Sequence, residues 1–285
     1  MKTARKKRKF EWGYLLLLPG LGYILFFLAG ATGMMIAQSF GLFNYTAESR
    51  FSLEYWRGIL NETFVDDLLY SLKIAVCASL LCICIAYPLA LIIKKLPGER
   101  TILSLVKIPM FIPALVASLL ILNIIDYHGI LNIILVRLQI IEEPLRLRND
   151  SWGVAALLIQ AWKNIPFMLI IMYSAVEAVR RDVIDAARNL GAGRLAVFAQ
   201  IIVTLTLPSA LVSVILVFIR VFNDYVISKT AGPLYPNTIS NLMHVTAYLY
   251  NDWPSAACIG CLMVITAVSF VSVYNYLSKK LLQNL

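Results

Sequence analysis

Charged side chains are scarce in this sequence. Only 14% of its 285 residues are Asp, Glu, Lys or Arg, whereas 60% are hydrophobic. A soluble domain usually has about 25% charged residues, so this chain lacks the polar side chains needed to cover a globule in water. Much of its surface must therefore face lipid, and the chain is long enough for several membrane spans of roughly 20 residues each.

Metal-binding and nucleotide-binding patterns are also missing. The five cysteines lie in two apolar blocks, and Cys258-x-x-Cys261 has no second pair or nearby histidine that would complete a metal site. His128 and His244 have no ligands at suitable spacing. No Gly-x-x-x-x-Gly-Lys-Ser/Thr phosphate loop occurs, so ATP must be hydrolysed elsewhere if it is used. We therefore expect no catalytic residue, metal or cofactor in this chain, and without a convergent set of titratable groups a membrane enzyme is disfavoured.

The positive charge indicates a membrane rather than nucleic acid as the partner. The net charge is +9, but Lys and Arg gather in residues 1–11 and in short loops, and no basic face is interleaved with stacking aromatics. If the N-terminus is inside, fifteen of these cations lie in inside segments and six in outside loops. Since cytoplasmic loops carry the excess of Lys and Arg, both termini are predicted to be cytoplasmic.

Six continuous apolar blocks account for most of the chain. Each is long enough to cross a hydrocarbon core of about 30 Å as a helix, and lipid offers no partner to free backbone groups, so helices are required. The alternation of a membrane barrel is absent. No cleavage site of small residues follows the first block, so we expect it to be retained as a span. The blocks cover residues 14–39, 68–93, 102–125, 152–176, 207–228 and 256–277.

These blocks predict an all-α integral membrane protein with six transmembrane helices and an N-in/C-in topology. We divide it into a cytoplasmic basic N-terminus at 1–11 and one transmembrane domain at 12–285. Outside the membrane, residues 41–67 are expected to contain a short surface helix. The amphipathic stretch 130–139 is expected to lie along the outer interface.

The inside loop at about 177–206 differs from the other loops because it is rich in Ala and Arg. Residues 183–190 favour a helix, and Gly191 with Gly193 favours a turn, because glycine tolerates positive φ and ends helices. A second short helix at 194–202 then leads back to the membrane. Composition alone favours an ordinary hairpin between two spans.

The order of residues in this loop resembles the cytoplasmic "EAA" loop of binding-protein-dependent ABC importer permeases. That pattern is Glu-Ala-Ala, three residues, Gly-Ala, then Phe, Ile and Pro at fixed offsets. Here it reads Asp185, Ala186, Ala187, then Gly191, Ala192, Phe198, Ile201 and Pro208. The family often has a second proline where this chain has Thr204, and we expect this difference to straighten the entry to the fifth span while leaving the turn intact.

The resemblance extends from about residue 52 to the C-terminus. The segment Trp162-Lys163-Asn164-Ile165-Pro166-Phe167 is similar to the one that precedes the motif in these permeases. Further similarity, to the spermidine/putrescine-type branch, lies in Tyr87-Pro88-Leu89-Ala90, which we interpret as a turn in the second span, and in Asp224-Tyr225-Val226-Ile227-Ser228, Gly232-Pro233 and Asp252-Trp253-Pro254.

This resemblance implies a MetI-like or MalF-type transmembrane domain with the type I ABC importer permease fold, in a bacterial inner (cytoplasmic) membrane. The implied partners are a cytosolic ABC ATPase dimer that binds ATP and Mg, a second permease subunit that is homologous or identical, an extracytoplasmic solute-binding protein and the lipid bilayer. The loop would contact the ATPase through residues 188–197. The coupling-loop residues are Asp185, Ala186, Ala187, Arg188, Gly191, Ala192, Gly193 and Phe198.

Polar residues inside the apolar blocks mark either a transport pathway or structural pairs, because ionisable groups in lipid are costly. Arg220 and Asp224 are four residues apart and can pair on one helix face. Lys163 precedes Pro166, which frees a backbone carbonyl, and in the alternative interpretation the lysine pairs with a carbonyl or carboxylate instead of cargo. Both interpretations stay open. The candidate pathway residues are Trp162, Lys163, Asn223, Asp224, Tyr225 and Asp126.

The identity of the cargo also stays open at this point. An amine would prefer Asp126, Asp224 and aromatic faces, whereas Lys163 and Arg220 fit an anion or act as counter-ions. A small polar solute of the polyamine type is favoured, and a sugar, iron, phosphonate or other organic ion remains an alternative. A secondary transporter is less favoured, since the sequence has no inverted repeat and no pair of broken spans in matching halves.

Overall fold

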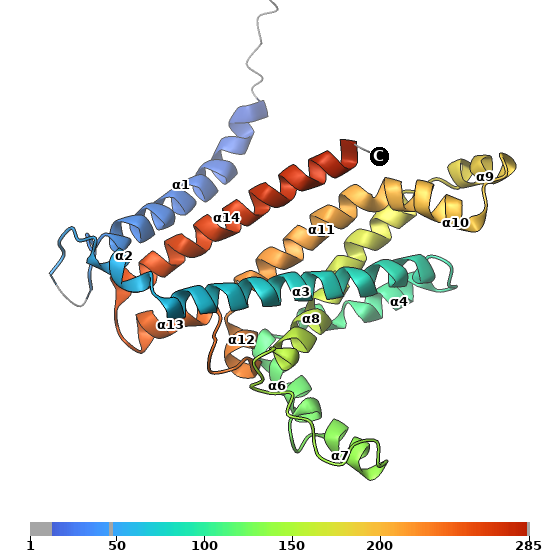
Figure 1. Ribbon diagram of the computed structural model, residues 1–285. Coiled ribbons are helices and arrows are strands. Elements are labelled where there is room, and N and C mark those ends of the chain that lie inside the picture. The colour runs from blue at the N-terminus through green and yellow to red at the C-terminus, as the bar shows by residue number, and fades with distance from the viewer. Residues whose placement is uncertain (1–12, 46–47, 284–285) are drawn as a thin grey trace, which may run out of the picture.

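The computed structural model describes residues 13–45 and 48–283. The basic segment predicted at 1–11 lies outside the described residues. In the described part the regular elements are all helical (Figure 1). They are α1 (Gly13–Ser39), α2 (Glu54–Ile59), α3 (Glu62–Ile93), α4 (Glu99–Val106), α5 (Ile108–Phe111), α6 (Ala114–Ile125), α7 (Ile130–Arg137), α8 (Val154–Glu177), α9 (Arg181–Asn189), α10 (Arg194–Ala196), the π-helix η1 (Val197–Val203), α11 (Thr204–Phe222), α12 (Val226–Ala231), α13 (Ile239–Tyr248) and α14 (Trp253–Gln283).

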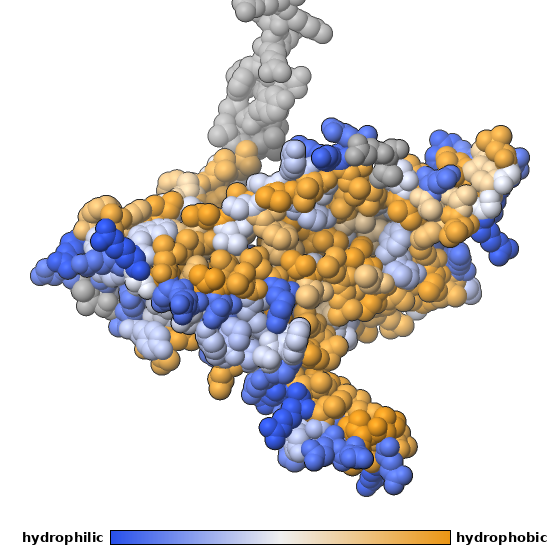
Figure 2. All heavy atoms as spheres, in the orientation of Figure 1, coloured by the Kyte–Doolittle hydropathy of each residue, from blue (hydrophilic) through white to orange (hydrophobic). Residues whose placement is uncertain are grey.

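Six helical segments of the described chain are long and apolar enough to cross a membrane, as predicted. They are Pro19–Ser39, Glu62–Ile93, Ala114–Arg137, Val154–Glu177, Arg194–Phe222 and Trp253–Gln283. An apolar surface covers the long helices, while hydrophilic residues gather mainly toward the two ends of the bundle and beside α7, whose own residues are largely apolar (Figure 2). This distribution suits a bundle whose middle is surrounded by lipid.

The core of the bundle forms where α3 packs against α8 and α11, while α14 packs against α1 and α13. Small residues follow one another along the buried face of α3, and Ala75, Ala78, Cys82, Ala86 and Ala90 are all fully buried. Without large side chains between them, helix backbones can approach closely, and close packing replaces the hydrophobic drive that lipid does not supply. The larger side chains of Met168, Met172, Phe218 and Phe222 fill the space on the facing helices.

The third span differs most from the prediction. Residues 102–125 were predicted to form one helix, but the structure divides them into parts of α4, α5 and α6. The chain leaves the helix at Lys107, just before Pro109 in the first turn of α5, and again at Ile112 and Pro113, where Ile112 is extended with ψ of 125°. Proline disfavours the helical conformation in the residue before it and removes a backbone donor. The apolar segment that is long enough to span here is instead Ala114–Arg137, which includes α6 and α7, so residues 130–137, expected along the outer interface, belong to this candidate span.

Two smaller predictions were also wrong. The fifth span ends at Phe222 rather than at residue 228, because Asn223 to Tyr225 leave the helix before α12 begins. The segment from Tyr87 to Ala90 is not a turn, since Pro88 lies inside the continuous helix α3. Membrane helices tolerate internal proline because neighbouring groups satisfy the freed carbonyl. The short surface helix expected in 41–67 is present as α2.

Candidate functional site

The loop between α8 and α11 forms a helical hairpin that projects from one end of the bundle, on the side to which α3, α8 and α14 point with their C-terminal ends (Figure 1). Helix α9 ends at Asn189, and Gly191 follows with φ of +88°. The Ala192 N–H donates to the Ala187 carbonyl at 3.0 Å, and the Gly191 N–H donates to the Arg188 carbonyl at 2.9 Å. These two bonds define a Schellman motif, in which the left-handed residue is usually glycine.

The two glycines of the turn have different roles. Gly191 needs its positive φ, which an L-residue adopts only at a cost. Gly193 has φ of −69° and ψ of 167°, a conformation open to any residue, and it directly precedes α10. A Cβ atom on either glycine would meet no other atom within 4 Å. The turn is therefore fixed in shape by Gly191 and has an uncovered surface.

Two leucines beside this turn are the most exposed large apolar side chains of the loop. Leu190 is 89% exposed and Leu195 is 80% exposed. Both lie within the contact range predicted at 188–197, but neither was among the residues named individually, although both directly flank the Gly191–Gly193 turn that the sequence does predict. Exposed apolar groups that cluster at a projecting tip mark a surface for another protein. We refer to Leu190, Gly191, Ala192, Gly193 and Leu195 as the loop tip.

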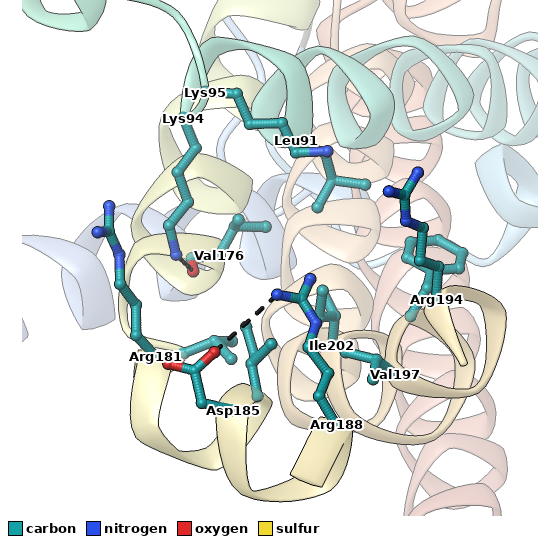
Figure 3. A pocket seen from close by; sticks show the side chains of 13 residues that line it. Leu91, Lys94, Lys95, Val176, Arg181, Asp185, Arg188, Arg194, Val197 and Ile202 are labelled. Carbon is teal, nitrogen blue, oxygen red and sulfur yellow. Dashed lines mark hydrogen bonds and ion pairs between the residues drawn. The ribbon is translucent and has the colours of Figure 1, made fainter. Parts of the chain in front are cut away.

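Charged residues lie on α9 behind the loop tip. Asp185 and Arg188 are 3.9 Å apart, and both side chains are more than half exposed (Figure 3). Arg180 and Asp182 also pair at the start of α9. Ion pairs this exposed contribute little to stability, typically about 0–1 kcal/mol. The predicted residues Asp185, Ala186 and Arg188 thus have exposed faces that remain available to a partner.

A π-helix connects the loop to the membrane. Residues Val197–Val203 form η1, and α11 continues from Thr204. A π-helix locally inserts an extra residue into the helical register, a feature often found at functional sites. The expectation that Thr204 straightens this entry stays a prediction. The Thr206 hydroxyl lies 2.9 Å from the Tyr87 hydroxyl, and the rings of Tyr87 and Phe198 have centroids 6.4 Å apart. The π-helix and the start of α11 therefore contact α3 through these side chains.

The side chain of Lys163 donates hydrogen bonds to the backbone where the predicted third span is broken. Its Nζ donates to the carbonyls of Ile112 and, at 3.4 Å, of Pro109. Pro113 has no N–H to donate to the Pro109 carbonyl four residues earlier, so this acceptor would otherwise be left without its helical partner. The structure therefore supports the interpretation that Lys163 donates to a backbone carbonyl.

Asp224 stabilises the break between α11 and α12. Its Oδ1 accepts a hydrogen bond from the Ile227 N–H at 2.8 Å, and its backbone carbonyl accepts one from the Ser240 hydroxyl at 2.7 Å. The predicted Arg220–Asp224 ion pair is not formed, because the helix ends before residue 224. The Arg220 guanidinium instead lies 4.6 Å from the centroid of the Phe167 ring.

The remaining candidate pathway residues occupy three separate places. Asn223 and Tyr225 line a cavity of about 480 Å³ among α1, α13 and α14, where the Tyr225 ring stacks on His244 with centroids 4.1 Å apart. Asp126 pairs with Arg148 at 3.1 Å in a cavity of about 290 Å³ that Arg146 also lines. Trp162 lies half-buried on α8, next to Lys163. Asp126 thus pairs with one arginine and shares its cavity with a second.

The fold and the projecting hairpin are those of a membrane permease. Residues 83–283 match the family of "binding-protein-dependent transport system inner membrane component" proteins. This chain belongs to that family and is a multi-pass membrane protein that acts as the permease of a binding-protein-dependent ABC importer. The family that the loop resemblance implied is therefore confirmed, while the roles of the loop residues stay predictions.

Several characterised proteins are similar to this chain. The spermidine/putrescine transport system permease protein PotB of Escherichia coli is 28% identical over 79% of this chain and 82% of its own length. The trehalose/maltose transport system permease protein MalF of Thermococcus litoralis is 25% identical over 96% of both chains. Among solved structures, a bacterial ABC transporter for alginate import matches with a TM-score of 0.74 and 17% identity, over 94% of each chain. This last likeness supports the type I importer permease fold.

Proposed function

We propose that this chain is one transmembrane subunit of an ATP-driven importer for polyamines in the bacterial inner membrane. It would receive the cargo from an extracytoplasmic binding protein and pass it to the cytoplasm by alternating access. The observation that carries this proposal is the similarity to PotB permeases over 79% of the chain. The named partners follow from membership of the importer family.

The loop tip is the proposed contact with a cytosolic ATPase dimer, which binds ATP and Mg. Leu190 and Leu195 are 89% and 80% exposed and offer an apolar contact area on a projecting turn. The Schellman motif at Gly191 gives that area a fixed shape, so little conformational entropy is lost on docking. Displacement of the loop would then reach α11 and α3 through η1 and the Tyr87–Thr206 contact.

A second permease subunit, similar or identical to this one, is proposed to complete the transport pathway. Arg220 lies in the last turn of α11, within a candidate span, and is exposed on the single chain. A charged side chain at membrane depth faces a protein partner or a water-filled path rather than lipid, because exposure to lipid is costly. Asn223, three residues further on, is exposed as well. This face of α11 is therefore where the second subunit would lie.

The test is uptake of labelled spermidine by cells that express this chain with its partners, compared with cells that lack the chain. We expect saturable uptake that excess unlabelled putrescine reduces and that trehalose and 2-aminoethylphosphonate leave unchanged. No uptake of labelled spermidine above the cells that lack the chain would reject polyamine as the cargo. Uptake of labelled trehalose or maltose instead would be in line with the MalF relative. Uptake of labelled 2-aminoethylphosphonate would be in line with the name of a further relative, PhnU of Salmonella typhi.

A further inference from the structure

A basic cavity of about 840 Å³ opens between the loop hairpin and the cytoplasmic ends of α3 and α8 (Figure 3). It lies behind the loop tip, and neither Leu190 nor Leu195 lines it. Five cations and a single carboxylate line the cavity. They are Lys94, Lys95, Arg181, Arg188, Arg194 and Asp185.

Most of this positive charge has no anionic partner in the described part of the chain. Asp185 is already 3.9 Å from Arg188, and Lys94 donates to the Val176 carbonyl at 2.6 Å. No ion pair within the described residues involves Lys95, Arg181 or Arg194. Burial lowers the pKa of Lys94, and the nearby Arg181 lowers that pKa further, whereas the carboxylates of Glu177 and Glu99 partly offset this. The cavity therefore has a surplus of positive potential that favours an anion.

The cavity is apolar on the side that faces the membrane. Leu91 lies on the last turn of α3, Val176 on the last turn of α8, and Ile202 just before α11 begins; all three line the cavity together with the cations. Helices α3 and α8 end as membrane spans at Ile93 and Glu177. The cations are therefore level with the head groups of the cytoplasmic leaflet, with apolar side chains on the side of the acyl chains.

We infer that this cavity binds an anionic phospholipid of the cytoplasmic leaflet. Its phosphate would lie among the lysines and arginines, which hold phosphate through charge-assisted hydrogen bonds. Its first acyl carbons would contact Leu91 and Ile202. Basic pockets between transmembrane helices on the cytoplasmic side are known to suit such head groups. A free phosphate would satisfy the cations but would leave the apolar side of the cavity open to water.

A lipid bound in this cavity would affect the position of the loop. Lys94 and Lys95 belong to the end of α3, whereas Arg188 and Arg194 belong to the hairpin. Helix α9 packs mainly on η1 and makes few contacts with the long helices. A head group bound to both sets of cations would hold the hairpin against α3, so an anionic lipid should favour one position of the loop.

The test uses the full-length chain purified in mild detergent and titrated with phosphatidylglycerol or phosphatidylcholine, with bound lipid counted by native mass spectrometry. We expect one phosphatidylglycerol to be retained in preference to phosphatidylcholine. The double variant Lys95→Gln with Arg181→Gln should weaken this binding about 25-fold, because each cation contributes about 1 kcal/mol near the membrane surface and 1.4 kcal/mol is a factor of ten. Both side chains are exposed, so the fold should tolerate the changes.

Two matched variants distinguish the cavity from general attraction between a cationic protein and anionic lipid. Lys279→Gln with Lys280→Gln removes the same charge from the exposed end of α14, outside the cavity, and should leave the retained lipid in place. Lys95→Arg with Arg181→Lys keeps the charge and should keep the preference. An equal loss from both glutamine pairs, or equal retention of the two lipids, would overturn the inference.

Two further additions separate the alternative occupants. Millimolar inorganic phosphate that displaces the lipid completely would indicate a site for free anions. An ATPase subunit that displaces the lipid on binding would indicate that the cations belong to the ATPase contact. Either result would overturn the lipid assignment, whereas retention of phosphatidylglycerol under both conditions supports it.

Discussion

Replacing Leu190 by serine removes an apolar side chain from the loop tip with little effect on the fold of the chain itself. Leu190 is 89% exposed, so the isolated permease gains almost nothing from its burial. Full burial of a leucine stabilises a contact by about 1.5–3 kcal/mol, and nearly all of this would come from docking to the ATPase. Since 1.4 kcal/mol is a factor of ten, Leu190→Ser should weaken ATPase binding roughly 10- to 100-fold.

The assay is the dissociation constant between the ATPase subunit and the full-length chain in lipid nanodiscs. Leu234→Ser is a matched control, because Leu234 is also 89% exposed but lies in the loop between α12 and α13, at the other end of the bundle. The control should bind the ATPase as tightly as the wild type. A dissociation constant for Leu190→Ser within twofold of wild type, or an equal loss in Leu234→Ser, would refute the assignment of the loop tip.

Three further predictions concern the turn and the polar residues in the membrane. Gly191→Ala places a Cβ at φ of +88° and should cost about 1–2 kcal/mol, so ATP hydrolysis stimulated by the binding protein should fall, whereas Gly193→Ala should retain it. Lys163→Met leaves the carbonyls of the third span without their donor and should lower stability by about 1–3 kcal/mol in thermal unfolding within nanodiscs; an unchanged unfolding temperature would contradict this role. Asp224→Asn can still cap α12, so its level in the membrane should match wild type while spermidine uptake falls; equal loss of both would make Asp224 purely structural.

The long spans and the loop were predictable because their signals are local. Continuous apolar runs give α1, α3, α8, α11 and α14, and hydropathy alone identifies such runs. The turn at Gly191 was predictable for a similar reason, since glycine after a helix-favouring segment is a common helix end. The match of the EAA pattern then gave this turn a function that its composition alone did not indicate.

The broken third span was not predictable from hydropathy, because Pro109 and Pro113 lie within an apolar run that remains apolar whether or not the helix continues. Its partner, Lys163, lies about fifty residues further along the chain, on α8. A contact between residues so distant in sequence depends on how helices pack, which no single-sequence pattern describes. The role of Lys163 as a donor to freed carbonyls therefore remained one of two open interpretations.

The Arg220–Asp224 pair was predicted from a spacing of four residues, which places side chains on one face only while the helix continues. Asn223 follows the last residue of α11, and Arg220 lies in its last turn; both are local signals of a helix end, but they were not used, so the spacing was applied across that end. The exposure of Leu190 and Leu195 was missed for a different reason. Apolar residues are usually expected to be buried, and only the three-dimensional structure shows that both project from the loop tip.

The most direct test of the proposed function is ATP-dependent uptake into proteoliposomes that contain the complex purified through this chain. With the binding protein outside and ATP inside, we predict that labelled spermidine accumulates in the liposomes. Leu190→Ser should reduce this accumulation. The control Leu234→Ser should leave the binding of the ATPase subunit to the chain unchanged. Accumulation by the chain alone, without an ATPase subunit or ATP, would contradict the account and would indicate a secondary transporter.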